Sequence, residues 1–121
     1  MTFAELDSGG YKTLKVFASD LNSTALTEFS CEKIPDVKIA ESIRASMSIP
    51  LFFDAWKFPD GQPDDHIYID GGVLYNYPIT AFEDLDKTLG FFIDINDVDS
   101  GLECNDVSSY LKHLFRTVLN A

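Results

Sequence analysis

The sequence predicts an α/β fold with a central, mainly parallel sheet flanked by helices. Short β-branched and aromatic runs alternate with segments whose apolar residues recur at helical spacing, which is the pattern of α/β domains. Leu89 to Ile95 is an almost unbroken apolar run, as expected for a strand that is covered on both faces. With 121 residues, of which 45% are hydrophobic, the chain can form one modest core, and residues 1–121 are interpreted as one unit.

The first half of the chain is predicted to contain two strands and a helix. Tyr11 to Ala18 alternates after a Gly-Gly break and predicts a strand, and a polar turn separates it from a second strand at Ala25 to Phe29. Asp36 is a suitable N-cap for a helix, which ends before Pro50 because the residue preceding a proline avoids helical backbone. The residues of this helix that are expected to face the core are Ile39, Ala40, Ile43 and Met47.

The second half begins with a short strand at Ile67 to Ile69, which Asp70-Gly71-Gly72 interrupts. Pro78 is predicted to open a helix that continues to Leu85, and the apolar strand at Leu89 to Ile95 follows. Asp106 is a predicted cap for a last amphipathic helix. The apolar face of that helix consists of Val107, Leu111, Leu114, Phe115 and Val118. No Gly or Pro stops this helix, so we expect the natural chain to continue.

Composition excludes several classes of function. The formal charge of −11 and only nine scattered Lys and Arg residues argue against a nucleic-acid partner, which requires clustered basic residues. Two cysteines without zinc-ligand spacing, and an acidic stretch at 94–103 that does not match a calcium loop, give no reason to expect a metal or another cofactor. No signal peptide or membrane-spanning run is visible, so a cytoplasmic protein, or one peripheral to a membrane, is expected.

Asp70-Gly71-Gly72 is the segment most indicative of function. An aspartate at the carboxyl end of a strand, followed by glycines where the chain must turn, stands where α/β folds commonly place functional groups. The competing interpretation is a plain β-hairpin, because Asp-Gly between apolar runs is a strong hairpin signal.

The surrounding residues resemble the patatin-like phospholipase family. The resemblance rests on Ala45-Ser-Met-Ser-Ile-Pro-Leu-Phe-Phe53, then Tyr68-Ile-Asp-Gly-Gly72, then Asn76-Tyr-Pro78, in the family's order. Ala18-Ser-Asp-Leu-Asn22 resembles an upstream turn of the same family. The resemblance implies a three-layer domain related to the α/β-hydrolases, with residues 1–121 as its C-terminal portion. It also implies a lipid ester substrate and a Ser–Asp dyad that cleaves acyl esters.

Residue by residue, the resemblance makes Asp70 the dyad aspartate, with Gly71 and Gly72 supporting its turn. Asn76 is interpreted as a possible second-layer support for Asp70. The predicted walls of the pocket around Asp70 are Phe52, Phe53, Tyr68 and Ile69. No serine has glycine two residues away on both sides, so the Gly-x-Ser-x-Gly nucleophile segment is absent from these residues and is expected upstream. The chain is therefore predicted to be inactive alone.

Other interpretations stay open beside this one. The chain is alternatively a non-catalytic interaction or scaffold domain, for which an unpaired sheet edge predicts self-association or a protein partner. The other candidate partners are the missing N-terminal half of the domain and a membrane surface contacted peripherally. Ser30 and Lys33 fit a Ser-x-x-Lys pattern that is common by chance, and His66 is interpreted as a loop histidine, not a triad member.

Overall fold

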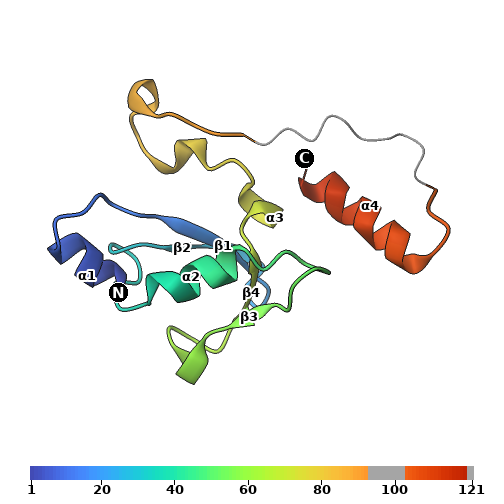
Figure 1. Ribbon diagram of the computed structural model, residues 1–121, viewed down its shortest axis with the longest axis horizontal. Coiled ribbons are helices and arrows are strands. Elements are labelled where there is room, and N and C mark those ends of the chain that lie inside the picture. The colour runs from blue at the N-terminus through green and yellow to red at the C-terminus, as the bar shows by residue number, and fades with distance from the viewer. Residues whose placement is uncertain (93–102, 120–121) are drawn as a thin grey trace. The chain divides into compact units, whose positions relative to one another are not determined.

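The computed structural model describes residues 1–92 and 103–119 of the chain. The chain divides into two compact units, Met1–Asn76 and Tyr77–Ala121, which are described separately. Figure 1 shows that the strands all belong to the first unit. The α/β class is confirmed, since helices and a sheet share this unit. The prediction that residues 1–121 are one portion of a single domain stays a prediction.

The sheet has four strands in the order β2-β1-β4-β3. The strands are β1 (Val16–Asp20), β2 (Ala25–Phe29), β3 (Trp56–Lys57) and β4 (Ile67–Asp70). Each neighbouring pair is antiparallel, so the prediction of a mainly parallel sheet is wrong. The reason is that β2 and β4, which do run in the same direction, are not neighbours, because β1 lies between them and runs the opposite way.

The predicted strand at Ala25 to Phe29 is confirmed as β2, whereas β1 begins later than Tyr11 and extends to Asp20. The turn between them is closed by the carboxylate of Asp20, which accepts hydrogen bonds from the amides of Asn22 and Ser23. Thr24 takes a left-handed backbone with φ of 55° at the end of this turn. An Asx-type turn therefore sets the register in which Val16 pairs with Phe29.

Two helices precede β3. Helix α1 (Phe3–Ser8), which the sequence interpretation missed, begins with a capping box in which Thr2 and Glu5 exchange side-chain hydrogen bonds. Helix α2 (Ile39–Ser46) has Lys38 at its N-cap without a side-chain bond, so the predicted cap at Asp36 is wrong. A backbone bridge between Thr2 and Lys38 joins the starts of the two helices.

The predicted core face of α2 is only partly right, because Ile39 packs against the core whereas Ala40, Ile43 and Met47 are exposed. The helix buries Ser42 and Ala45, while Ile43 and Met47 are 45% and 51% exposed. Small side chains allow the helix to lie close to the sheet, and α2 contacts β1 and β4 through this side. The larger side chains of Ile43 and Met47 lie on the exposed side of the helix.

The core of the first unit is built around three aromatic rings from three different segments. Phe29, Phe58 and Tyr68 lie with ring centres 5.4–5.5 Å apart in tilted or edge-to-face pairs. Such pairs add about 0.5–1.5 kcal/mol each beyond the area they bury. The other buried apolar residues are Phe3, Ala18, Val37 and Ala45. On the opposite face of the sheet, Tyr75 of α3 (Gly72–Tyr75) packs edge-on against Phe17 at 5.3 Å.

The second unit has less regular structure. The helix predicted from Pro78 to Leu85 is replaced by two short 3₁₀ helices, Ile79–Ala81 and Leu85–Lys87. Leu89 to Phe92 is exposed and lacks strand structure, so the predicted buried strand is wrong there, and its last three residues lie outside the described part.

Helix α4 (Val107–Leu119) confirms the last predicted helix, and Asp106 caps it by accepting a hydrogen bond from the Ser109 amide at 2.6 Å. The acidic stretch at 94–103 falls outside the described residues, apart from Glu103. Within the described ranges, no helix has the length and apolar character needed to cross a bilayer.

Candidate functional site

Asp70 is the last residue of β4, and hydrogen bonds hold its peptide group from two sides. Its amide donates to the carbonyl of Ser48 at 3.0 Å, just after α2. Its carbonyl accepts a hydrogen bond from the hydroxyl of Ser19 at 2.9 Å, and it pairs with Ala18 across the sheet. Because Ser19 and Ser48 are both buried, the backbone at Asp70 is fixed by groups that water does not reach.

Gly71 and Gly72 lead directly from β4 into α3, so no hairpin forms at this bend and that alternative is wrong. Gly71 has φ of −63°, an ordinary helical value, so its glycine is not required by a left-handed backbone. A Cβ atom at Gly71 would instead overlap the carbonyl oxygen of Phe17. Glycine is therefore required here because β1 and the bend approach each other too closely for a side chain.

The carboxylate of Asp70 is half-buried and accepts a hydrogen bond from the Gly72 amide at 2.7 Å through Oδ1. Burial raises the pKa of Asp70, and the Gly72 amide partly opposes that shift. The C-terminal end of α2 lies against the backbone of this bend, because the Gly71 amide donates a hydrogen bond to the Ser46 carbonyl at 3.3 Å.

The residues predicted to surround Asp70 do not all lie where expected. The side chain of Tyr68 is part of the aromatic core, where its hydroxyl donates to Asp64 at 2.8 Å. Phe52 and Phe53 are exposed, and Ile69 is partly buried. Asn76 is exposed at the end of α3, and its support of Asp70 stays a prediction.

His66 lies at the opposite end of β4 from Asp70, about 13 Å along the strand at ~3.3 Å per residue. Its Nδ1 atom is 2.7 Å from Oδ2 of Asp20, an almost fully buried carboxylate. The interpretation of His66 as a simple loop histidine missed this pair. The only sequence signal for a structural role of Asp20 is the segment Ser19-Asp-Leu-Asn22 at the end of β1. An aspartate that opens such a turn often accepts hydrogen bonds from backbone amides.

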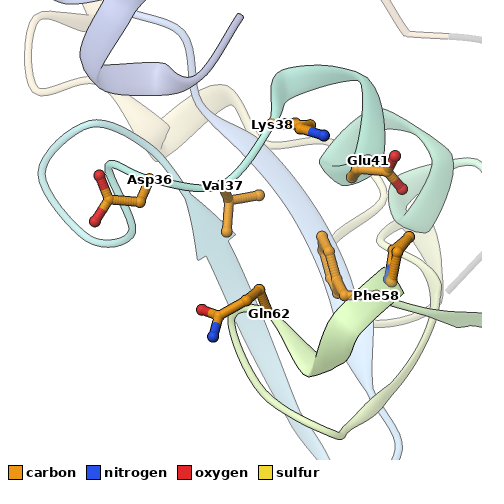
Figure 2. Close-up of a pocket in the computed structure, with 7 residues that line it drawn as sticks. Asp36, Val37, Lys38, Glu41, Phe58 and Gln62 are labelled. Atoms are coloured by element: carbon orange, nitrogen blue, oxygen red, sulfur yellow. The ribbon is translucent and has the colours of Figure 1, made fainter.

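A cavity of about 230 Å³ lies in the first unit, between the segment that enters α2 and the turn after β3. Figure 2 shows Val37, Phe58 and Gln62 around it, with Glu41 projecting from α2. None of the residues that line this cavity forms the hydrogen bonds that hold Asp70. The cavity is therefore a separate feature from the bend at Asp70.

Comparisons with known proteins identify a family that covers this bend. The sequence model of the family described as "Patatin-like phospholipase" matches residues 4–83, which include Ser19, Ser48 and Asp70. No solved structure gives a significant match.

Two viral proteins are similar to the chain. "Uncharacterized protein R571" of Acanthamoeba polyphaga mimivirus is 32% identical over 124 residues, which cover 97% of this chain and 39% of that protein. "Probable lipid hydrolase 463L" of Invertebrate iridescent virus 6 is 34% identical over 79 residues, which cover 65% of this chain and 26% of that protein. The chain thus corresponds to well under half the length of either relative.

Proposed function

Because the chain belongs to the patatin-like phospholipase family, we propose that it is part of a lipid acyl hydrolase and supplies the aspartate of a Ser–Asp dyad. The observation that carries this proposal is the placement of Asp70. Its carboxylate stands at the end of a strand, on a backbone that two buried serines hold, and burial raises its pKa. The name of the iridescent virus relative, a probable lipid hydrolase, supports the same class of substrate.

In the proposed reaction, Asp70 accepts the proton of a serine hydroxyl while the serine oxygen attacks the carbonyl carbon of a lipid ester. An acyl-serine forms, and the lipid alcohol leaves with the proton that Asp70 releases. Water, deprotonated by Asp70, then attacks the acyl-serine; the serine oxygen leaves, takes that proton back from Asp70, and the fatty acid is released. A raised pKa suits this role, because an aspartate of ordinary pKa is a weak base at neutral pH.

The nucleophile has to come from residues outside 1–121, because no serine here lies in a Gly-x-Ser-x-Gly segment. We therefore expect these 121 residues to be inactive alone toward phospholipid vesicles and short-chain esters. A longer chain that carries such a segment from the same gene is expected to release fatty acid from phosphatidylcholine vesicles.

The decisive variant is Asp70→Asn in that longer chain, measured by fatty-acid release. We expect the rate to fall by about 10²–10⁴-fold, the usual contribution of a general base. Asp54→Asn is the matched control, because Asp54 is an exposed carboxylate in the segment before β3. Full activity of the Asp70→Asn protein would exclude the dyad.

A second candidate is a non-catalytic interaction domain, which the exposed apolar residues of the first unit favour. Among the described residues of that unit, α2 and the turn that follows it expose Ile43, Met47, Leu51, Phe52 and Phe53. Apolar side chains gathered in this way often mark a surface that another chain or a lipid covers. The proposed occupants are a second copy paired at the β2 edge, the nucleophile-bearing part of the domain, and a membrane surface.

Size-exclusion chromatography with light scattering distinguishes these occupants. Self-association of the 121 residues supports a second copy at the β2 edge, and a compact monomer at high concentration contradicts that occupant. Co-sedimentation with neutral vesicles tests the peripheral membrane contact separately.

A further inference from the structure

Arg44, near the end of α2, contacts the turn after the helix and strand β3. Its Nη1 atom donates to the hydroxyl of Ser48 at 2.7 Å. Its guanidinium carbon lies 5.0 Å from the ring centre of Trp56 in β3 and 5.8 Å from that of Phe53 in the turn after the helix. Among the described residues, Arg44 forms no ion pair with a carboxylate, so its planar cation is used for stacking and for the Ser48 hydrogen bond.

Ser48 is fully buried and links Arg44 to the backbone of Asp70. Its hydroxyl also donates to the Arg44 carbonyl at 2.8 Å, which fastens Ser48 to the last turn of α2. The Ser48 carbonyl accepts the Asp70 amide at 3.0 Å, and the Ser46 carbonyl accepts the Gly71 amide at 3.3 Å. The carbonyls at the end of a helix lack partners within the helix, and here they hold the bend that carries Asp70.

We propose that Arg44 and Ser48 are positioning residues for Asp70. By fixing the end of α2, they fix the backbone amides of Asp70 and Gly71, and so the orientation of the Asp70 side chain at the end of β4. Neither residue contacts the carboxylate itself through a hydrogen bond among the described residues. The catalytic meaning of this placement rests on the proposed function, whereas the placement itself is a property of the 121 residues.

The test compares Arg44→Gln, Arg44→Lys and Ser48→Ala in the 121-residue chain. Ser42→Ala is the matched control, because Ser42 is also fully buried in α2 and donates to a carbonyl of the same helix, that of Ile39, at 2.8 Å. The readouts are amide hydrogen exchange at Asp70 and Gly71, NMR titration of the Asp70 carboxyl, and the emission of Trp56, which is the chain's one tryptophan.

Arg44→Gln and Ser48→Ala are expected to speed amide exchange at Asp70 and Gly71 about fivefold to tenfold, as for the loss of one ordinary hydrogen bond. The pKa of Asp70 is expected to fall toward its usual value as water reaches the carboxyl. Arg44→Lys should give a smaller change in the same direction, because lysine keeps the positive charge but lacks the planar guanidinium group that stacks on the rings. Both Arg44 variants should change Trp56 emission, whereas Ser42→Ala should leave all three readouts as in the parent chain.

Exchange and titration at Asp70 that are the same in the Arg44 and Ser48 variants as in Ser42→Ala would overturn the proposal. If Ser48→Ala does not fold, the two Arg44 variants decide, because Arg44 is partly exposed and its replacement leaves the core intact. These measurements need no ester substrate. A full ester-cleavage rate in the longer Asp70→Asn protein would therefore exclude the dyad while leaving the positioning result readable.

Discussion

Replacing Asp20 by asparagine removes a buried carboxylate that accepts four hydrogen bonds at the turn between β1 and β2. Oδ1 accepts the amides of Asn22 at 2.8 Å and Ser23 at 3.2 Å. Oδ2 accepts the Ser23 hydroxyl at 2.6 Å and lies 2.7 Å from Nδ1 of His66. An asparagine has one acceptor oxygen and no charge, so it cannot satisfy both sets of donors.

The magnitude follows from the pKa of Asp20. Burial alone would raise this pKa, but hydrogen bonds from the Ser23 hydroxyl, from His66 and from the amides of Ser23 and Asn22 lower it from 3.8 to about 2. A pKa lowered by this amount corresponds to about 2 kcal/mol of stability. Because the side chain of His66 is partly exposed, solvent screening reduces this contribution to about 1–2 kcal/mol. This stability is present above pH ~4 and is lost as the pH falls from there toward 2.

His66 adds a second dependence with the opposite sign. The hydrogen bond to Asp20 raises the pKa of His66; burial opposes this, and the charges of Asp20, Asp64 and Asp65 add to it. A raised histidine pKa contributes stability that is complete below pH ~6.5 and is lost as the pH rises through the higher folded value. The Asp20–His66 pair therefore stabilises the fold most between about pH 4 and pH 6.5.

Urea unfolding of the parent chain and Asp20→Asn at about pH 2.5, 5.5 and 8 measures both dependences. We expect a difference in unfolding free energy of about 1–2 kcal/mol at about pH 5.5, a smaller one at about pH 8, and the smallest at about pH 2.5. Asp54→Asn, at an exposed carboxylate, controls for the change in net charge. The same difference at all three pH values would refute the reasoning, because it would mean that ionisation of Asp20 is irrelevant.

Two further substitutions, Gly71→Ala and Tyr68→Phe, test the packing around β4, and Gly10→Ala is the control for the first. Gly71→Ala should destabilise the first unit by about 1–3 kcal/mol in urea unfolding, because its Cβ would overlap the Phe17 carbonyl. Gly10→Ala, at φ of +74° with open space around it, should cost only about 1 kcal/mol, and a larger effect there than at Gly71 would contradict the steric argument. Tyr68→Phe should lower the unfolding free energy by about 1 kcal/mol through loss of the Asp64 hydrogen bond; no change would show that water replaces it fully.

The elements that sequence reasoning predicted correctly are those whose signals are local. The strand Ala25–Phe29 and the cap of α4 at Asp106 depend on neighbouring residues, and both were found. The face of α2 depended on a distant partner. Periodicity placed Ile39 correctly against the core but Ile43 and Met47 wrongly, because it counts apolarity and ignores side-chain size. Ser42 and Ala45 are buried because a helix seated closely on a sheet requires small residues.

The same distinction between local signals and long-range contacts applies to the functional site. The position of Asp70 at the end of a strand could be predicted from a short motif and a family resemblance. The Asp20–His66 pair could not, because it joins residues 46 positions apart that meet only through the β1–β4 register. The link from Arg44 to Asp70 was equally hidden, since it depends on how the end of α2 is placed against β4.

Helix α2 thus presents two faces that satisfy different requirements. Its carbonyl end holds the bend at Asp70 through the carbonyls of Ser46 and Ser48, while its inner face buries small residues, among them Ser42. The side chains of Ile43 and Met47, which a helical pattern assigns to a core, project outward instead. In the catalytic proposal, the segment that brings the serine has to reach the Asp70 carboxylate, and it is also available to cover the apolar side chains of Ile43 and Met47. In the scaffold proposal, a partner covers the same side chains while Asp70 stays without a serine, and ester cleavage by the assembled protein separates the two.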